Sequence, residues 1–494
     1  MEVKIKESDI KILDSSSNKR IFIFDKFFEK FHRYFFCIQL FMLLAFLFLI
    51  IAPVCSKNPK STDTIFTNVI LLSQFLFWGV WYGACLLSVI PFGRLWCGML
   101  CPLGAFTQWA GKFGLKRKIP KWMKSEFWLV LMFTVITVMG QTLDVRDDPW
   151  GMIKLFGFIF LLAVIIGLVY SQNGGRPWCR YFCPIGKILG VISRLSFVQI
   201  SPNRGVKTLP NNKDYFVQGR LCPTDYNLPY KISTNNCITC GKCVTTQKKA
   251  GLGNYFRSPG VELTKVLDRD PNWSEVAFIL LAPGLAAGGF LWLILHQYQL
   301  FRDDIATYLI NHNIMWPFNS APWLLSSQTW NQNFNWLDIF TISIYMLLYG
   351  FITALISGIL IAIASFIARS PSERSFKRVF YLFTYQFTPV AMLTIVIGLC
   401  GKFFEVMQAD FGMLQSTSDF IKATLFMLSI IWSILLLYKA IKKVLNLNLV
   451  KTTIVAGLLI INLVLISFIW RPAIFNKAYI SDVEKIRQHI VVPE

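Results

Sequence analysis

Long apolar segments constrain the fold of this chain more than any other feature of its sequence. A helical membrane span needs about 20 apolar residues, and nine segments of the chain meet this need. They lie at about residues 34–54, 64–92, 126–142, 152–170, 273–298, 338–368, 379–400, 421–441 and 452–470. Charged residues make up 15% of the chain, against roughly 25% in soluble domains. The sequence therefore predicts an all-α polytopic membrane protein with about nine transmembrane helices.

Basic residues are distributed unevenly over the loops of this chain, whose formal net charge is +22. If the N-terminus is cytoplasmic, the short inner loops at 93–125, 369–378 and 439–451 hold 15 Lys and Arg residues, whereas the outer loops hold 5. Lys and Arg are concentrated in the cytoplasmic loops of membrane proteins, so we expect this orientation, with a periplasmic C-terminus. We interpret the charge excess as a topology signal and expect no nucleic acid as a partner.

The spans and the polar segments between them divide the chain into five expected parts. Residues 171–272 contain no apolar span and carry 15 Lys and Arg with scattered Gly and Pro, which is typical of an extramembrane segment. The parts are a cytoplasmic N-terminal segment at 1–33, a four-helix membrane unit at 34–200, a cytoplasmic segment at 201–272, a five-helix membrane domain at 273–470 and a periplasmic tail at 471–494. In the five-helix domain, Gly284 and Gly288 form a G-x-x-x-G spacing that favours close helix packing.

A twelve-residue pattern occurs twice, 82 residues apart, at the inner ends of the second and fourth predicted spans. Each copy reads Gly-Arg-x-Trp-Cys-x3-Cys-Pro-x-Gly; the first contains Cys97 and Cys101, and the second contains Cys179 and Cys183. The expected topology puts all four thiols on the same side of the membrane at similar depth. Soft thiolates select iron–sulfur clusters, zinc or copper(I), and the C-x3-C-P ending matches the last ligand pair of bacterial ferredoxins. We therefore predict a four-thiolate iron–sulfur site.

Plainer interpretations of the repeat stay open. Cysteines near helix ends also pack as small hydrophobic residues, although duplication of the whole pattern argues against this here. Arg94 and Arg176, the second residue of each copy, either follow the positive-inside rule or ease the burial of a negatively charged cluster. We keep both roles for the arginines.

The polar segment adds a third cysteine motif, Cys237-Ile238-Thr239-Cys240-Gly241-Lys242-Cys243, which is the C-x2-C-x2-C core of a ferredoxin site. The Cys-Pro that normally follows is missing, but Cys222 precedes Pro223 upstream, so we predict Cys222 as the fourth ligand. A three-cysteine cluster with another fourth ligand, and a zinc site, are the alternatives. The remaining cysteines, Cys37, Cys55, Cys85 and Cys400, are expected to pack. Eight ligands in two sets imply two [4Fe–4S] clusters.

The duplicated Trp-Cys-x3-Cys-Pro motif at the inner ends of a four-span unit, followed by C-x2-C-x2-C, resembles the membrane-bound polyferredoxin family of the NosR, NapH and CcoG type. The resemblance covers about residues 30–250. It implies [4Fe–4S] clusters on the cytoplasmic side of a bacterial inner membrane, a redox partner protein or quinol, and a quinone as a candidate further cofactor. Members commonly carry two complete ferredoxin sites, whereas this chain has one incomplete run. The spans after residue 273 show no such resemblance.

The leading functional hypothesis is therefore an iron–sulfur electron carrier, and an oxidoreductase component if it acts as an enzyme. Cluster chemistry is one-electron transfer and needs no acid or base from the chain. The carrier would relay electrons, from a quinol or from the cytoplasm, to a partner oxidoreductase or to its maturation system. The alternatives are a copper or iron reductase at the cytoplasmic face, and a non-redox scaffold or transporter that is stabilised by zinc.

Overall fold

The structure, a computed structural model of the 494-residue chain, describes most of the sequence. The described residues are 21–60, 62–172, 174–202, 222–226, 228, 231–246, 252–268, 271–326, 328–329, 332–369, 375–445 and 449–475. Most of the expected N-terminal segment at 1–33 and of the expected tail at 471–494 lies outside these residues, as does part of the expected cytoplasmic segment at 201–272.

The chain is an all-α polytopic membrane protein, as its apolar segments predict. In the described residues, seven helices are long and apolar enough to cross a membrane, and an eighth span results if the bent pair Phe376–Tyr385 and Thr388–Leu399 counts as one. The seven are Phe22–Ile51, Val69–Phe92, Pro149–Tyr170, Trp273–Ile294, Trp336–Ala368, Gln415–Val444 and Leu449–Phe475. The segment predicted as a span at 126–142 is the shorter apolar helix Phe127–Thr142. All nine predicted segments are thus helical, but seven to eight of them meet the requirements for a span.

The chain divides into two compact units that both draw on several stretches of the sequence. The first consists of the described parts of Met1–Phe48, Ala84–Phe133 and Ile159–Glu275, and the second of those of Leu49–Gly83, Thr134–Phe158 and Val276–Glu494. All three cysteine motifs belong to the first unit.

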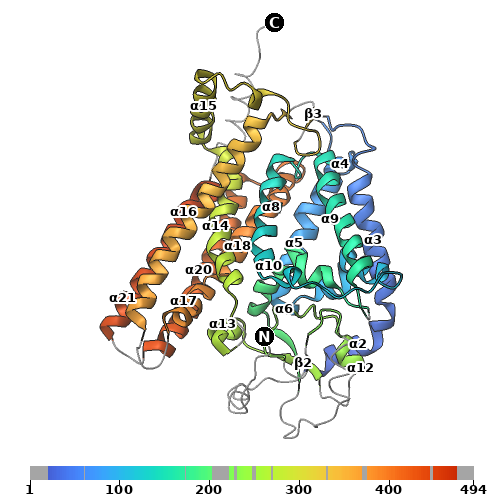
Figure 1. The fold of residues 1–494 in the computed structure, drawn as a ribbon, viewed down its shortest axis with the longest axis vertical. Helices are drawn as coiled ribbons and strands as arrows, with labels where there is room; N and C mark the ends of the chain where they lie inside the picture. The colour runs from blue at the N-terminus through green and yellow to red at the C-terminus, as the bar shows by residue number, and fades with distance from the viewer. Residues whose placement is uncertain are drawn as a thin grey trace. The chain divides into compact units, whose positions relative to one another are not determined.

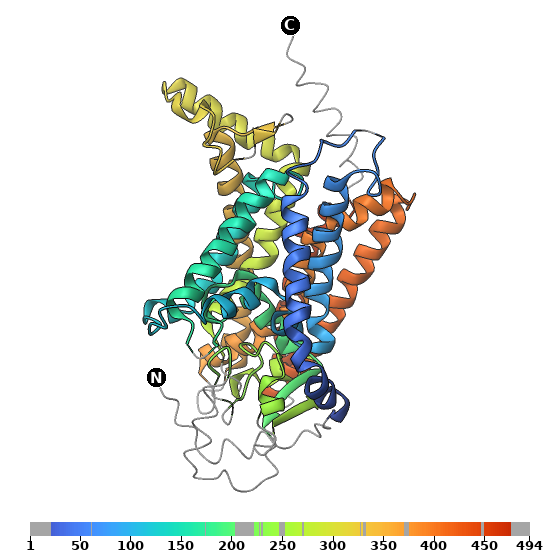
Figure 2. The same ribbon diagram turned by 90° about the vertical axis from the view of Figure 1, so that its right-hand side faces the viewer.

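Short helices and one strand pair accompany the apolar helices in the first unit. Its elements are α2 (Phe22–Phe31), η2 (His32–Tyr34), most of α3 (Phe35–Ile51), the end of α5 (Tyr82–Leu87), α6 (Val89–Phe92), η4 (Trp96–Leu100), α7 (Pro102–Ala110), η5 (Trp122–Lys124), the start of α8 (Phe127–Thr142), the end of α9 (Pro149–Tyr170), η6 (Trp178–Phe182), α10 (Pro184–Ile192), η7 (Ser193–Leu195), β1 (Val198–Pro202), α12 (Lys242–Thr246), β2 (Leu252–Phe256), α13 (Val261–Thr264) and η10 (Val266–Asp268). β1 and β2 pair antiparallel, with Ile200 opposite Asn254. Figure 2 shows this pair beside α2 at the lower end of the view.

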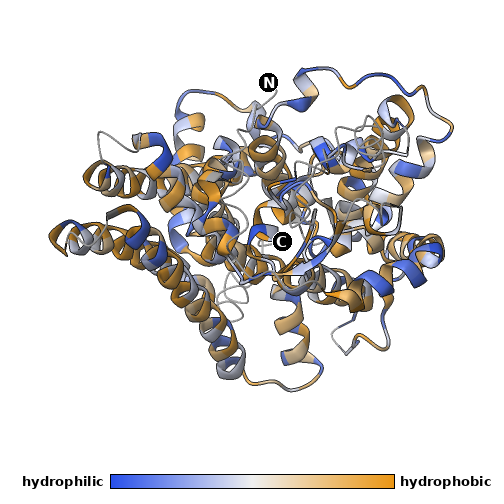
Figure 3. Ribbon diagram, turned by 90° about the horizontal axis from the view of Figure 1, so that it is seen from below, coloured by the Kyte–Doolittle hydropathy of each residue, from blue (hydrophilic) through white to orange (hydrophobic). Residues whose placement is uncertain are grey.

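Long helices dominate the second unit. Its elements are the end of α3, α4 (Val69–Gln74), η3 (Phe75–Trp81), the start of α5, the end of α8, the start of α9, most of α14 (Trp273–Ile294), α15 (His296–Asn311), η11 (Trp316–Phe318), β3 (Gln328–Thr329), β4 (Gln332–Asn333), α16 (Trp336–Ala368), α17 (Phe376–Tyr385), α18 (Thr388–Leu399), α19 (Gly401–Ala409), α20 (Gln415–Leu445) and α21 (Leu449–Phe475). α16 packs along α21, and the two lie side by side in Figure 1. The ribbons of these long helices are coloured mostly as hydrophobic in Figure 3.

Local sequence explains where several helices begin. Asn335 and Asp338 form a capping box at the start of α16, in which each side chain accepts a hydrogen bond from the other residue's backbone N–H. The Asp148 carboxylate accepts a hydrogen bond from the Trp150 N–H at the start of α9. Proline begins both α7 and α10, where its missing N–H costs no helical hydrogen bond.

The G-x-x-x-G spacing in α14 packs against α16. A Cβ atom added to Gly284 would lie 2.5 Å from the Cβ of Thr353 and 2.6 Å from the Tyr349 carbonyl oxygen. At Gly288 the added Cβ would lie 3.0 Å from the Cα of Met346. The two backbones therefore approach closely because the glycines carry no side chain, as in other small-residue helix contacts in membranes.

This close approach predicts a difference between two glycine-to-alanine substitutions. Gly284→Ala forces its methyl group into α16, and overpacking of this kind costs about 1–3 kcal/mol. Gly457→Ala in α21 meets no atom within 4 Å, so it should be neutral or slightly stabilising, because alanine has the higher helix propensity. Thermal unfolding in detergent is expected to show a lower Tm for Gly284→Ala alone. Equal Tm values for both variants would contradict the packing of α14 on α16.

Candidate metal centre

The two copies of the repeat form two turns of the same unusual type. Residues Trp96–Leu100 and Trp178–Phe182 are π-helical, and they close with hydrogen bonds from Cys101 N–H to the Trp96 carbonyl (2.8 Å) and from Cys183 N–H to the Trp178 carbonyl (2.9 Å). A π-helical turn is wider than an α-helical one and occurs often at functional sites. The repeat in sequence is thus a repeat in backbone geometry.

The second cysteine of each copy lies at the start of a helix. Cys101 and Cys183 take extended conformations, with ψ of 116° and 113°, and a proline then begins α7 or α10. The Gly186 N–H donates to the Cys183 Sγ at 3.2 Å, and the Gly104 N–H makes the matching bond to Cys101. A helix N-terminus carries partial positive charge, so the Cys-Pro-x-Gly sequence places an N–H donor and a favourable dipole at each sulfur.

The arginine of each copy reaches across to the other copy. The Arg176 Nη1 donates to the Cys97 carbonyl at 2.8 Å, and it would lie 3.2 Å from a Cβ added to Gly104. In the opposite direction, the Arg94 Nη2 would lie 3.1 Å from a Cβ added to Gly186. Both arginines are buried, with exposed fractions of 2% for Arg94 and 3% for Arg176. The glycine of each Cys-Pro-x-Gly leaves the space that the other copy's guanidinium needs.

These contacts gather the four cysteines of the repeat into a first thiol set, Cys97, Cys101, Cys179 and Cys183. Burial, together with the neighbouring Cys179 and Cys97, raises the pKa of Cys101 to about 12. Burial also raises the pKa of Cys179 to about 11, against the opposing charge of Arg176. Burial and the three other thiols raise the pKa of Cys183. The four thiols therefore interact electrostatically within one buried region, and cations lie beside them.

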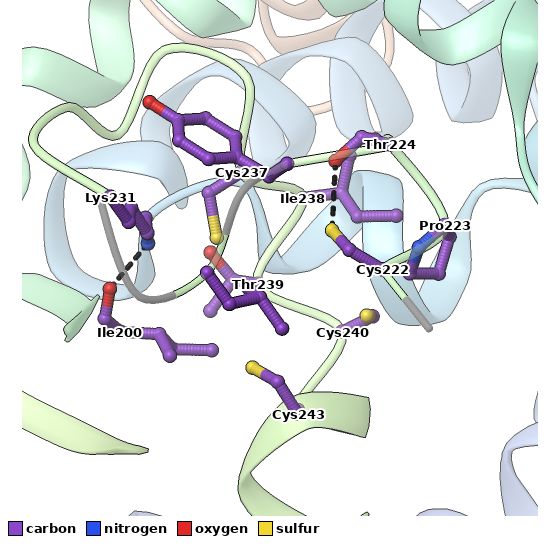
Figure 4. A pocket seen from close by; sticks show the side chains of 13 residues that line it. Ile200, Cys222, Pro223, Thr224, Lys231, Cys237, Ile238, Thr239, Cys240 and Cys243 are labelled. Carbon is purple, nitrogen blue, oxygen red and sulfur yellow. Dashed lines mark hydrogen bonds between the residues drawn. The ribbon is translucent and has the colours of Figure 1, made fainter. Parts of the chain in front are cut away.

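The four cysteines of the polar segment line a single pocket and form the second thiol set, Cys222, Cys237, Cys240 and Cys243. Figure 4 shows their sulfur atoms around this pocket, with Cys222 brought in by a stretch of chain that precedes the C-x2-C-x2-C loop. The Cys222 Sγ lies 3.4 Å from the Thr224 Oγ1. The structure thus places Cys222 with the three cysteines of the motif.

Left-handed backbone positions shape the loop of the second thiol set. Thr239 has φ 46° and Gly241 has φ 68°, so the chain turns sharply after each of the first two cysteines. The Thr239 N–H then bonds to the Cys237 sulfur, and the Lys242 N–H bonds to the Cys240 sulfur. Hydrogen bonds to sulfur are among the means by which a protein tunes an iron–sulfur cluster.

A buried lysine belongs to the second thiol set. Lys231 is 4% exposed, and its ammonium group donates to the Ile200 carbonyl and to Cys237. Burial raises the pKa of Cys237, but the charge of Lys231 and the Thr239 N–H outweigh it, so the net shift of this pKa is downward. Burial raises the pKa of Cys240 to about 11, and Cys222 adds to the rise.

The two thiol sets lie next to each other in the first unit. A Cβ added to Gly98, between Cys97 and Cys101, would lie 2.3 Å from the Ile238 carbonyl oxygen and 2.8 Å from the Cα of Cys240. The loop of the second thiol set therefore packs directly on the π-helical turn of the first copy. The second copy has Arg180 at the equivalent position, where such packing is impossible. This one difference between the copies marks the face on which the loop lies.

A buried ionic network holds the residues that precede the loop. The Glu262 carboxylate accepts hydrogen bonds from Arg194 at 3.0 Å and from Ser233 at 2.7 Å, and it also pairs with Arg257. Arg194 bonds to Glu275 at 2.8 Å, which in turn accepts from the Asn235 side chain at 3.0 Å. Breaking one partner of a buried pair costs roughly 3–5 kcal/mol. The network therefore fixes the chain two residues before Cys237.

Cys85 was expected to pack, and it is buried, with an exposed fraction of 3%. Sequence reasoning missed other residues of this region. Lys231 and Asn235 were not singled out, because neither lies in a recognisable motif. Their signal in the sequence is weak: each lies within six residues of Cys237, in a segment otherwise rich in Ser, Thr and Asn.

In the part of the chain that the structure describes, no three Cys, His, Asp or Glu side chains stand close enough to hold a single metal ion. An iron–sulfur cage takes a wider ring of ligands, because each thiolate binds a different iron atom.

Comparison with known families bears on this chemistry. The profile of a family described as a 4Fe-4S binding domain matches residues 74–120 and 154–201, so that each matched segment contains one copy of the repeat. An uncharacterized protein of Methanocaldococcus jannaschii is 25% identical over 170 residues, which are 32% of this chain and 63% of that protein. The ferredoxin-type protein NapH of Escherichia coli is 24% identical over 179 residues, 31% of this chain and 58% of its own length. The methylamine utilization ferredoxin-type protein MauN of Paracoccus denitrificans is 28% identical over 153 residues, 27% of this chain and 53% of its own length.

The chain is similar to membrane polyferredoxin-type proteins over the segments that carry the repeat. This confirms the resemblance that the duplicated motif indicated. The chain spans between about half and two thirds of the length of the three relatives named above. The matched domain also supports iron–sulfur binding.

The C-terminal half of the chain has a similarity of its own. The profile of a family described as the Yip1 domain matches residues 253–471, where the sequence motifs indicated no family. No solved structure matches the chain.

The packing of the loop on the first copy predicts the effect of one substitution. Gly98→Ala places a methyl group against Ile238 and Cys240, so it should displace the loop and lower the free energy of unfolding by about 1–3 kcal/mol. Gly157→Ala in α9 meets no atom within 4 Å and serves as the control. Thermal unfolding and iron content of both purified variants are the measurements. Wild-type stability and iron content in Gly98→Ala would show that the loop does not lie on this turn.

Proposed function

We propose that this protein holds two [4Fe–4S] clusters and relays single electrons to a partner oxidoreductase or to the system that matures one. The first thiol set is the proposed ligand set of one cluster, and the second thiol set is that of the other. The observation that carries the proposal is the grouping of eight cysteines, from three motifs, into two sets of four on directly packed elements.

The residues around both sets fit a cluster with four thiolates. Such a cluster is negatively charged, so its burial needs compensating groups. Each set has N–H donors at its sulfurs, from Gly104 and Gly186 in one case and from Thr239 and Lys242 in the other. Guanidinium and ammonium groups lie within the same region. Bound clusters supply one-electron chemistry.

The two thiol sets differ in how deeply they are buried. The first thiol set is the more buried one, since Cys97, Cys179 and Cys183 are 6%, 5% and 8% exposed. All cysteines of the second thiol set are half-buried, so this set is the proposed exchange point with a donor or acceptor. The excess of basic residues in the inner loops supports a position of both sets on the cytoplasmic side. A redox protein or a quinol is the proposed partner, and a quinone remains a candidate further cofactor.

The cluster content provides the first test. Protein purified without oxygen is expected to contain about eight iron atoms and eight sulfides per chain, as two cubane clusters require. Cys97→Ser should remove about half of the iron, and Cys55→Ser, which changes an exposed cysteine outside both sets, should remove none. Stoichiometric zinc with no iron would overturn the proposal in favour of a zinc-stabilised membrane protein.

The role of Cys222 has a separate test. If Cys222 is the fourth ligand of the second thiol set, Cys222→Ser leaves three thiolates there, so the site should lose one iron atom. Paramagnetic resonance of the oxidised variant is then expected to show a three-iron signal that the wild-type protein lacks. Cys85→Ser is the matched control, because Cys85 lies beside the other set. A Cys222→Ser spectrum identical to that of the wild type would assign the fourth position to another group.

A further inference from the structure

We propose that Arg94 and Arg176 form one shared pair of cations that raises the reduction potentials of both cluster sites together. The inference rests on the proposed function and deepens it. It concerns how the chain tunes the relay, because the same two residues contact the first thiol set and the segments that position the loop of the second.

Arg176 belongs to the second copy of the repeat but contacts the first. Its Nη1 donates to the carbonyls of Cys97 at 2.8 Å and of Gly98 at 3.3 Å. Gly98 is the residue on which the loop of the second thiol set packs. The guanidinium charge acts on Cys101 and Cys179 in the first thiol set, and also on Cys240 in the second. Arg176 therefore lies where the two sets meet.

Arg94 makes the reciprocal contacts from the first copy. Its Nη2 lies 3.9 Å from the Cys97 sulfur, and its Nη1 donates to the Asn235 carbonyl at 2.6 Å, two residues before Cys237. Its charge acts on Cys179 and on Cys237. Both arginines thus contact the first thiol set. Arg94 also contacts the chain that leads into the loop of the second thiol set, and Arg176 contacts the turn on which that loop packs.

The sign of the effect follows from charge. Reduction adds one electron, supplied by the external donor, to one site, and an arginine guanidinium stays positively charged in proteins. The reduced site is therefore more negative by one unit beside a fixed positive charge. Buried charges are weakly screened, so each arginine stabilises the reduced form of both sites. Loss of either cation should lower both potentials.

Lys231 supplies a contrast within the same molecule. Its ammonium group donates to Cys237 and to the Ile200 carbonyl, and its charge acts on Cys243. These contacts belong to the second thiol set. Removing the charge of Lys231 should therefore lower one potential, whereas removing the charge of Arg176 should lower two.

Gln108 permits a test in which the arginine stays in place. The Arg176 Nε donates to the Gln108 Oε1 at 2.9 Å. Gln108→Glu keeps the size of the side chain and its hydrogen bond but adds a negative charge at this oxygen. The substitution therefore offsets the charge of Arg176 while its contacts with Cys97 and Gly98 remain.

The experiment is a potentiometric titration of the full-length protein in detergent, followed by paramagnetic resonance. For Arg176→Gln and for Gln108→Glu, the ratio of reduced to oxidised cluster at a fixed potential is expected to fall about tenfold at both sites, which corresponds to about 59 mV for a one-electron couple. Arg176→Lys should keep both potentials near the wild-type values. Lys231→Gln should shift one site, and Arg302→Gln, which removes the same charge from an ion pair with Asp338, should shift neither.

The outcomes separate this inference from the proposed function. If wild-type protein contains no iron–sulfur clusters, the proposed function fails. If both clusters are present in Gln108→Glu and only one potential shifts, or none does, the shared-cation inference is wrong and the function stands. If Arg176→Gln loses its clusters, Gln108→Glu still decides the question, because it retains the guanidinium.

Discussion

The burial of charge beside a membrane is the constraint on which the rest of the first unit depends. A thiolate-bound cluster carries negative charge, and its transfer out of water is unfavourable unless donors and cations replace the lost hydration. The chain meets this requirement with hydrogen-bond donors and cations that lie close to the thiols. Backbone N–H groups point at Cys101, Cys183, Cys237 and Cys240, and three buried cations lie among the thiols. The π-helical turns, the prolines and the left-handed loop positions all serve to present these groups.

The two copies of the repeat contact each other in the same way, but they differ at the position that Gly98 occupies in the first copy. Because each copy contributes an arginine and a small residue, each guanidinium fits beside the glycine of the other copy. A strict repeat would offer the same surface on both copies. Gly98 breaks the symmetry, since its lack of a side chain lets the loop of the second thiol set settle on the first copy, where Arg180 would block it on the second. A single residue thus determines where the polar segment attaches.

Sequence reasoning predicted the helical segments, the grouping of the repeat cysteines and the position of Cys222 near the C-x2-C-x2-C loop, because periodicity and ligand spacing are local signals. It could not predict contacts that join distant segments, such as the bond from Arg94 to Asn235 across 141 residues. The segment predicted as one span at 379–400 is bent by 42° between α17 and α18. Pro389 near the start of α18 was a visible signal for that break, because proline disfavours helix before it.

The segment around the second thiol set shows how a chain without long helices or strands holds a rigid loop. Between Lys231 and Gly241 the backbone forms no regular element, so side chains must fix it. Glu262 and Glu275 hold Ser233 and Asn235, Arg94 holds the Asn235 carbonyl, and Gly98 receives the loop itself. Each contact comes from a different part of the first unit. The position of the loop therefore depends on contacts with the repeat and with α13 as well as on its own sequence.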